Sequence, residues 1–484
     1  MAIPVACRAE HGRHDPATWA RQGPVVTRLL VHNAVLLTLD PDRPEPFTGW
    51  FAVADDGRLT AVEPGDPPAG LLAGLTGDQL LDVGGALVGP GFVSAHSHLF
   101  TSGSRGLGTD QSLYGWIEAM LRYTFAAGTE DLYWMTRHGA QDFLRSGITT
   151  AFDFTDSGLT FARESDGVAH YSASLPDPLY QHAQLRATVD AGLRSVHSVM
   201  LGQGPVDHAA ALAHLDEVVG LAADTDPALL LRLAISGTVQ WADGPEAAEL
   251  EVAAMRRHGL LNQPHFLETP HEVELQQSKF GWYRDAGALG PDLVFGHFVH
   301  TTDEIIAEAA AAGCGMSWQP MSNGRLASGV ARIPEMRAAG MRVGIGLDDQ
   351  SCTDLSDPFG NMRTALALLR ATHLDPAAMP VRDVLELHTR GSAEVLGVDE
   401  HVGTLRVGRL ADFLVVDPRR PDTGPVWDAH GTYVLACSLR NLRQVWSGGR
   451  LVAEGETLCD PQAGEVEAQL HERMARLRHE VDGR

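Results

Sequence analysis

The sequence is almost without lysine and contains few cysteines. Its 484 residues include one lysine, Lys279, so arginine supplies nearly all the positive charge and a mechanism needing a lysine elsewhere is excluded. The five cysteines show no Cys-x-x-Cys spacing, which argues against a disulfide framework and a thiolate zinc site. They are Cys7, Cys314, Cys352, Cys437 and Cys459. No apolar run approaches the roughly 20 residues that span a bilayer, and the N-terminal segment lacks a long apolar core.

Positive charge is also scarce relative to negative charge. The chain has 37 Lys and Arg against 62 Asp and Glu, which gives a formal net charge of −25 at pH 7. Nucleic acid and anionic membranes need cationic partners, so both are disfavoured as ligands. The composition, 44% apolar and 20% charged, is that of an ordinary globular protein. A cytoplasmic enzyme is the default expectation, with two or three domains or one large barrel with an attachment.

Two strand-rich chain ends flank a long middle region with a different sequence pattern. A polar tail over residues 1–25 is followed by expected short strands over 26–88, and the same texture of strands and Asp, Gly and Pro turns returns over 401–460. We predict that both ends form one small β-sandwich domain. The segment 461–484 contains the polar amphipathic pattern GEVEAQLHERMARLRHEV and is predicted to be a helix.

The middle region, residues 89–400, alternates short apolar runs with helical stretches. The apolar runs are GFVSAH, ITTAFDF, GLRSVHSV, ALLLRLAI, QPHFLE, LVFGHF, CGMSWQ and RVGIGLD. Eight strands alternating with helices over about 300 residues predict an α/β fold, a (β/α)8 TIM barrel. In such barrels the chemistry lies at the carboxyl ends of the strands.

Candidate metal ligands fall at these strand ends. His96 and His98 end the first run and, spaced by one residue, would point to the same side of an extended strand. The pair alone is weak, because 22 histidines in 484 residues make about one such pair expected by chance. His265 ends the fifth run, His297 the sixth and Asp348 the eighth. Three imidazoles and a carboxylate can hold zinc, iron(II) or another borderline metal.

Five segments in a fixed order resemble the amidohydrolase superfamily. They are PGFVSAHSH, PHFLETPHEVE, LVFGHFVHTTDEII, SNGRLASGVARIPEM and VGIGLDDQSCTD. The resemblance is to the branch of heterocycle deaminases and triazine hydrolases, which includes S-adenosylhomocysteine, guanine and cytosine deaminases. The flanks ADFLVVD and VWSGGRLV resemble the family's sandwich strands, so the resemblance covers roughly residues 26–458.

The resemblance implies a role for each of these residues. The ligands of one divalent metal, Zn²⁺ or alternatively Fe²⁺, would be His96, His98, His265 and Asp348. His297 would orient the substrate or the attacking water. A metal lowers the pKa of bound water from 15.7 towards about 7. Asp348 is placed to accept a proton from that water, and Glu268, three residues after His265, can protonate the ring nitrogen and then the leaving group.

The sequence departs from the family pattern beside the last ligand. Many relatives have glycine where Asp349 stands, and Cys-Pro where this chain has Gln319 and Pro320. Asp349 would either recognise a cationic substrate or cap a loop. Further candidate pocket residues come from the segment that borders the pocket in relatives and from the third strand's end, although ordinary packing explains them equally well. They are Asp110, Gln111, Tyr114, Trp116 and His197.

Other superfamily members hold two metals bridged by a carbamylated lysine on a middle strand. In this chain ALLLRLAI offers Arg232 but no lysine, and Lys279 follows the fifth strand, which argues against such a bridge.

These observations predict a metal-dependent hydrolase that deaminates an amino-substituted purine, pyrimidine, pterin or triazine. Glu268 favours deamination, because ammonia is a poor leaving group until it is protonated. Two alternatives stay open: hydrolysis of an open-chain urea, carbamate or amide, and a noncatalytic binding scaffold, which predicts decayed ligands. A small-molecule substrate is expected as partner, and the resemblance implies a homo-oligomer.

Overall fold

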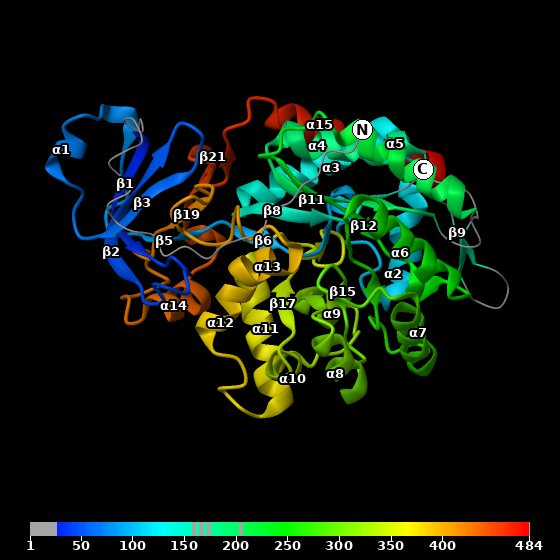
Figure 1. The fold of residues 1–484 in the computed structure, drawn as a ribbon. Coiled ribbons are helices and arrows are strands. Elements are labelled where there is room, and N and C mark those ends of the chain that lie inside the picture. The colour runs from blue at the N-terminus through cyan, green and yellow to red at the C-terminus, as the bar shows by residue number, and fades with distance from the viewer. Residues whose placement is uncertain are drawn as a thin grey trace, which may run out of the picture.

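The computed structural model describes residues 27–156, 161–163, 169–171, 175, 177–202 and 207–483. The predicted tail over 1–25 lies outside these residues. A β-rich part built from both chain ends lies beside a larger α/β part (Figure 1). Within the described ranges, no helix has both the length and the apolarity that crossing a membrane requires.

Strands from both chain ends form one nine-stranded sheet, ordered β22-β21-β20-β19-β5-β1-β2-β3 with β4 paired to β1. The strands are β1 Thr27–Leu36, β2 Phe47–Ala54, β3 Leu59–Pro64, β4 Leu80–Asp82, β5 Leu87–Pro90, β19 Phe413–Val416, β20 Leu442–Ser447, β21 Arg450–Glu454 and β22 Thr457–Leu458. The two ends meet where β5 pairs antiparallel with β19. The hydrogen-bonded ladder is continuous, so the structure does not confirm a sandwich of two separate sheets.

The sheet has its own apolar core and a polar tie to the barrel. Alternate residues of its strands face inward and are fully buried, and the rings of Phe51 and Phe413 meet edge-on with centroids 4.9 Å apart. The guanidinium of Arg194, on the barrel strand β11 (Arg194–Met200), donates to both carboxylate oxygens of Asp412 at 2.8 and 2.9 Å. This buried bidentate pair fixes the sheet against the barrel.

The middle region closes into a parallel barrel with eight strand positions, as predicted. They are β6 Phe92–Ser94 with β7 Ser97–His98, β8 Ile148–Asp153, β11 Arg194–Met200, β12 Leu230–Ser236, β13 Leu261–Asn262 with β14 His265–Phe266, β15 Val294–His297, β16 Gly315–Trp318, and β17 Arg342–Ile345 with β18 Asp348–Asp349. The barrel closes where the amide of Ala95 donates to the carbonyl of Ile345 at 3.0 Å and where β18 pairs with β7.

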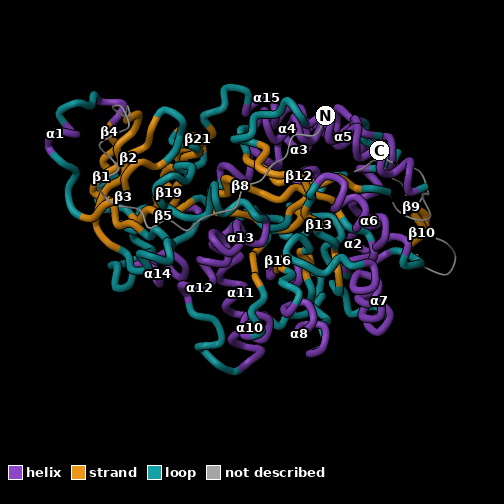
Figure 2. The backbone as a smooth tube through the Cα atoms, in the orientation of Figure 1, coloured by secondary structure: helices purple, strands orange, loops and turns teal. Residues whose placement is uncertain are grey.

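Helices surround these strands (Figure 2). The longer ones are α2 Leu113–Thr124, α3 Thr129–Arg145, α4 Pro178–Ala191, α5 His208–Ala222, α6 Glu246–His258, α7 Val273–Ala286, α8 Asp303–Ala311, α11 Pro358–His373 and α15 Ala463–Asp482. Shorter ones are α1 Ala69–Leu72, α9 Pro320–Arg325, α10 Ile333–Ala338, α12 Val381–Glu386, α13 Ser392–Leu396 and α14 Ala429–Gly431, and a hairpin joins β9 Phe161–Arg163 to β10 Ala169–Tyr171. Both faces of the barrel strands are covered, so even the polar residues of β8 and β11 are buried.

The C-terminal helix α15 confirms the helix predicted for 461–484. It packs on α2 and α3, where Arg473 and Arg476 donate to the two oxygens of Asp131 at 2.8 and 2.6 Å. Its Leu470 and Leu477 join one apolar cluster with Trp116 and Met120 of α2. The helix therefore supports from behind the segment that forms one wall of the site.

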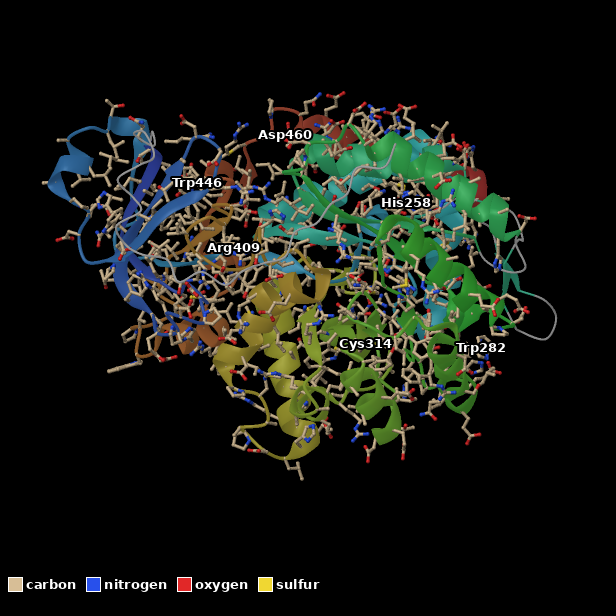
Figure 3. All side chains as sticks on the ribbon, viewed as in Figure 1. His258, Trp282, Cys314, Arg409, Trp446 and Asp460 are labelled. Carbon is tan, nitrogen blue, oxygen red and sulfur yellow. The ribbon has the colours of Figure 1, made fainter. Side chains whose placement is uncertain are left out.

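The described cysteines are free thiols, in agreement with the sequence. Cys314, Cys352 and Cys437 are buried and Cys459 is exposed. Figure 3 labels Cys314 within the barrel, surrounded by other side chains.

Candidate active site

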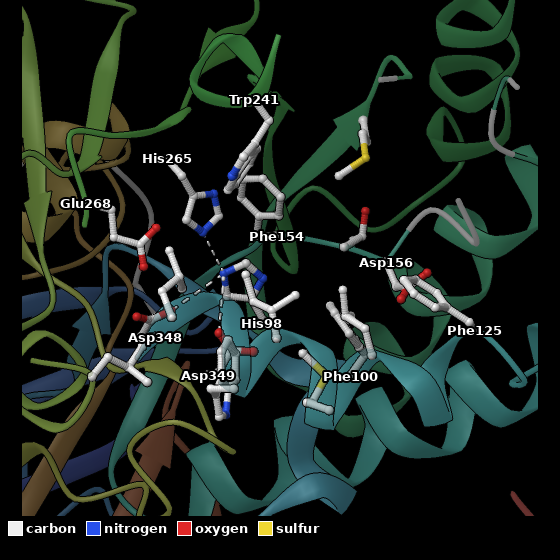
Figure 4. Close-up of a pocket in the computed structure, with 18 residues that line it drawn as sticks. His98, Phe100, Phe125, Phe154, Asp156, Trp241, His265, Glu268, Asp348 and Asp349 are labelled. Atoms are coloured by element: carbon white, nitrogen blue, oxygen red, sulfur yellow. Dashed lines mark hydrogen bonds and ion pairs between the residues drawn. The ribbon is translucent and has the colours of Figure 1, made fainter. Parts of the chain in front are cut away.

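A cavity of about 810 Å³ lies at the carboxyl ends of the barrel strands. Figure 4 shows His265, Glu268, Asp348 and Asp349 gathered at one end of it, with Phe125 at the opposite end. The polar end is built from strand ends β7, β14 and β18, and the wall beyond it comes largely from α2. Chemistry and substrate contact are thus supplied by different elements of the fold.

Three histidines present Nε2 atoms to one another at the polar end. Nε2 of His98 lies 3.1 Å from Nε2 of His96 and 3.2 Å from Nε2 of His265. Oδ1 of Asp348 lies 3.5 Å from Nε2 of His96 and 3.6 Å from Nε2 of His98. In a tetrahedral site with bonds of about 2.0–2.1 Å, neighbouring ligand atoms are about 3.3 Å apart. The four side chains therefore have the spacing of a single divalent metal site.

Hydrogen bonds on the far side of two rings fix which nitrogen is bare. Nε2 of Gln263 donates to the carbonyl of Ala95 at 2.9 Å, so its Oε1 faces Nδ1 of His96, 2.6 Å away, and accepts the proton there. Nδ1 of His98 donates to the carbonyl of Phe154. Both Nε2 atoms then carry lone pairs at 3.1 Å, an arrangement that repels unless a cation lies between them. The donor set fits a divalent metal.

The backbone turns sharply where the ligands leave the strands. His297 and Asp348 have φ of 65° and 67°, in the left-handed region that residues with a Cβ seldom adopt. A Cβ on Gly346 would lie 2.6 Å from the carbonyl oxygen of His96, so only glycine allows β17 to pass this close to the first strand. The strain and the close approach both bring side chains to the common centre.

Burial sets the protonation states of these groups. It lowers the pKa values of His96, His98 and His265, so their rings are neutral, the form that binds metals. Although burial opposes ionisation of Asp348, the neighbouring His297 and His96 hold the pKa of its carboxyl below the usual value. Three neutral imidazoles and one carboxylate result.

Glu268 differs from Asp348 although both are buried. Burial, and then the charge of Asp348, raise the pKa of Glu268 well above its usual range, which favours its protonated form. Its Oε1 lies 3.6 Å from Nε2 of His297, and among the described residues its Oε2 has no hydrogen-bond partner. A protonated carboxyl beside an ionised one is the arrangement of a proton donor next to a proton acceptor.

His297 is held in a different tautomer from His96 and His98. Nδ2 of Asn323 donates to Nδ1 of His297 at 2.9 Å, so Nε2 carries the hydrogen and points into the site. Oε1 of Gln319 accepts from the backbone amide of His297 at 2.9 Å. His297 is therefore a hydrogen-bond donor rather than a fifth ligand, in agreement with its predicted orienting role, which stays a prediction.

The predicted substrate contacts are distributed unevenly. Trp116 is buried and lines the cavity, with Nε1 donating to the carbonyl of Ser351 at 3.1 Å. Asp349 also lines it, and burial together with the neighbouring Asp348 raises the pKa of its carboxyl well above the usual value. Tyr114 is partly buried beside the cavity, where its ring meets that of His271 edge-on.

Three other predicted residues lie away from the cavity lining. Asp110 and Gln111 are exposed in the segment before α2. His197 is fully buried, and its Nε2 donates to the carbonyl of Gln181 in α4 at 3.1 Å. Its ring therefore points from β11 to the surrounding helices, and the predicted substrate contact of His197 is not supported.

Several residues of the site carried no sequence signal of their own. Gln263 and Asn323 act through neighbouring rings; Gln263 stands two residues before His265, and Asn323 lies in the motif before the last strand. The cavity lining also includes Phe100, Phe154 and Trp241, which the sequence analysis did not single out. Aromatic residues of this kind are common in ordinary cores, so spacing alone could not select them.

Lys279, the only lysine of the sequence, contacts backbone carbonyl groups. Nζ of Lys279 donates to the carbonyls of Gln240 and Ala242 at 2.8 and 2.7 Å, which fixes the loop before α6. Arg232 of β12 pairs with Asp292 at 2.7 Å. These polar contacts of both cationic side chains are thus with groups outside the histidine cluster.

Comparison with known proteins agrees with this geometry. The Amidohydrolase family matches residues 87–452. A 5-methylthioadenosine/S-adenosylhomocysteine deaminase of Syntrophobacter fumaroxidans is 32% identical, over 90% of this chain and 95% of that protein. An adenosine deaminase from Xanthomonas campestris with bound zinc superposes with a TM-score of 0.80 at 21% identity, over 93% of this chain and 99% of that one.

An atrazine chlorohydrolase from Arthrobacter aurescens complexed with zinc superposes with a TM-score of 0.76 at 21% identity, over 92% of this chain and all 100% of that chain. These solved structures share the barrel fold with this chain. The family match covers most of the chain, and the matched range includes the histidine and carboxylate side chains that meet in the cavity. The chain belongs to the amidohydrolase family.

Proposed function

We propose that the protein hydrolyses an amino-substituted N-heterocycle and releases ammonia, with one divalent metal held by His96, His98, His265 and Asp348. One observation carries the proposal: three imidazoles and the carboxyl of Asp348 meet at metal-ligand spacing directly beside Glu268, whose pKa is raised by burial. The cluster binds the cation, and Glu268 holds the proton that an amino leaving group needs. A noncatalytic scaffold would have no use for that proton.

When bound, the metal would supply Lewis-acid activation of water near neutral pH. Asp348 accepts the proton that the attacking water loses, and Nε2 of His297 donates a hydrogen bond to its oxygen. Glu268 protonates the ring nitrogen as the carbon is attacked, takes up the second water proton from the hydroxyl formed on that carbon, and passes it to the amino group; the proton held by Asp348 then restores Glu268. The C–N bond then breaks, NH3 leaves, and the ring carbon keeps the oxygen.

The relatives support this class of reaction. Two of the similar proteins are named as deaminases of adenosine or of substituted adenosines, and the third as an atrazine chlorohydrolase. The predicted class, a hydrolase of C–N bonds that deaminates an N-heterocycle, is confirmed at that level. The particular ring is part of our proposal, and adenine is the first to test.

The experiment measures ammonia and alkylamine from one substrate panel with zinc-loaded protein. The panel contains 5′-methylthioadenosine, adenosine, guanine, cytosine, an aminotriazine, an N-alkylurea and an N-alkylcarbamate. Ammonia from a ring substrate, lost in the Glu268→Gln variant at unchanged metal content, supports the proposal. Alkylamine from the open-chain substrates without ammonia from any ring would instead establish the alternative hydrolase.

We propose zinc as the metal, because nitrogen-rich tetrahedral sites suit it and two structural neighbours contain it. Iron(II) is the second candidate, since the same donor set accepts it. Elemental analysis of the purified protein, with His98→Ala as control, decides between them. A cytoplasmic homo-oligomer stays a prediction, and sedimentation velocity of the full chain tests the oligomeric state.

A further inference from the structure

The geometry points to a substrate that carries, besides the leaving amino group, an apolar substituent without negative charge. This inference rests on the proposed function and names the substrate class of the same site. The metal ligands and Glu268 occupy one end of the cavity, so the leaving amino group must lie there. Whatever else the heterocycle carries must extend along the remaining wall. The character of that wall therefore selects the substituent.

The wall is apolar over most of its length. Helix α2 turns Leu113, Trp116, Ile117, Met120 and Leu121 towards the cavity, at the i, i+3, i+4 spacing of one helix face. Within this set Leu113, Trp116 and Met120 are almost fully buried, with exposed fractions of 3–4%.

Two further side chains continue the surface beyond α2. Phe125, just after the helix, lies at the end of the cavity opposite Glu268 (Figure 4), and Met200 ends β11. A substituent packed along this wall gains about 0.8 kcal/mol for each buried methylene.

Among the described residues, the wall holds no cationic side chain. The lining residues include the acidic side chains Asp156, Glu268, Asp348 and Asp349 but no arginine or lysine. The arginines that adjoin lining residues in the chain are engaged elsewhere: Arg122 pairs with Asp482 at 2.6 Å, and Arg325 with Asp354 at 2.9 Å. A carboxylate or phosphate on the substrate would lose its hydration without gaining a cation, which costs several kcal/mol.

The polar groups at the far end do not offset this cost. The hydroxyl of Thr155 donates to the carbonyl of Ser198 at 2.9 Å and so is already used. Asp156 lies beside Phe125 in Figure 4, and its acidic side chain offers a substrate anion no positive charge. The cavity thus favours an uncharged arm and opposes an acidic one at the same position.

The test compares 9-isobutyladenine with 9-(carboxymethyl)adenine, which have the same ring and arms of nearly the same shape but differ by one negative charge. Zinc-loaded protein should deaminate the isobutyl compound with a kcat/KM at least 100-fold higher. Equal values, or a preference for the carboxylate, overturn the inference. Ammonia from both at equal rates would leave the proposed function standing and remove only this inference.

Binding separates the two proposals when turnover is absent. The dissociation constants of both compounds are measured calorimetrically on the zinc-loaded Glu268→Gln variant. Tighter binding of the isobutyl compound by at least 30-fold, with no ammonia from wild type, supports the inference and refutes deamination of adenine. Failure of both compounds to bind overturns the inference.

A charge variant gives an independent check. Phe125→Arg places a cation on the wall at a partly exposed position, and it should reduce the isobutyl preference at least tenfold. Leu435→Arg is the matched control: Leu435 is 50% exposed in the helical turn Thr432–Ala436 and should leave the preference unchanged. An unchanged preference in Phe125→Arg, with the variant folded by circular dichroism, contradicts the proposed position of the substituent.

Discussion

Asp153 is a buried carboxyl group that the proposed reaction does not use. It ends β8 with an exposed fraction of 0%, and its Oδ1 accepts from the amide of Leu99 at 3.3 Å. Among the described residues its Oδ2 has no hydrogen-bond partner, and it lies 3.9 Å from Nδ1 of His197. Burial lowers the pKa of His197 to about 3, so no cation faces the carboxyl. Burial accordingly raises the pKa of Asp153 to about 7.

This raised pKa makes the free energy of unfolding depend on pH. Between pH 4 and pH 7 the folded chain keeps a proton on Asp153 that the unfolded chain has released, so folding loses stability as the pH rises. A pKa of about 7 against the ordinary 3.8 corresponds to about 4 kcal/mol at pH 7 and above, at about 1.4 kcal/mol per pKa unit. Below pH 4 both states are protonated and the cost vanishes.

Asp153→Asn removes the titrating group while keeping its shape. Asparagine is neutral at every pH, its Oδ1 can still accept from Leu99, and its Nδ2 can donate to the bare Nδ1 of His197. Relative to wild type, the variant should gain about 3 kcal/mol between pH 4.5 and pH 8, because about 1 kcal/mol of the cost is already present at pH 4.5. Urea denaturation at fixed zinc concentration measures this, with the exposed Asp66→Asn as control. A difference between variant and wild type that is the same at both pH values would refute the reasoning.

Three further predictions concern the metal end of the site. Gln263→Leu should weaken zinc binding about 10- to 100-fold, because His96 loses the acceptor that fixes its tautomer. Competition with a chromophoric chelator measures the zinc affinity, and an unchanged affinity would contradict this role of Gln263. Asn323→Leu should lower kcat/KM about tenfold or more at full zinc content, because Nδ1 of His297 loses its donor; steady-state kinetics with metal analysis separates this from metal loss. Chelation should lower Tm reversibly, since a ligand at 100 times its Kd stabilises by about 2.7 kcal/mol, and an unchanged Tm would argue against a metal at this site.

The barrel and the metal cluster could be predicted from the sequence because both follow from local patterns. Short apolar runs mark strands that are covered on both faces, and all eight runs became strands. A parallel barrel then brings every carboxyl end to one rim, so His96, His265 and Asp348 had to approach one another although more than 250 residues separate the first from the last. Closure of the barrel, rather than any single motif, makes the prediction reliable.

Other features depend on packing that no local pattern encodes. The sequence pattern predicts His197 at a strand end like the metal ligands, yet it lies inside β11, which continues to Met200. Alternate residues of a strand face opposite sides, and its ring points outward to Gln181. The neighbouring Ser198 faces the other side, where its hydroxyl donates to the carbonyl of Asp153. A predicted strand end was thus not enough to place a side chain in the cavity, because the register of the pleat decides which side it faces. The pattern of the chain-end strands likewise predicts a sandwich, whereas in the structure the pairing of β5 with β19 joins them into one continuous sheet.

The same division explains why the reaction could be predicted further than the substrate. Ligands and proton donor stand on strand ends whose positions the barrel fixes, so their chemistry follows from residue type and order. The substrate wall stands on α2, whose apolar face is divided between the cavity and the supporting α15. Trp116 lines the cavity and also belongs to the cluster that contains Leu470 and Leu477 of α15, so sequence periodicity marks it as buried without saying against what. Substrate selection in this protein therefore depends on how two helices far apart in the sequence pack together, and substitutions on α15 that shift α2 should alter specificity while leaving metal binding intact.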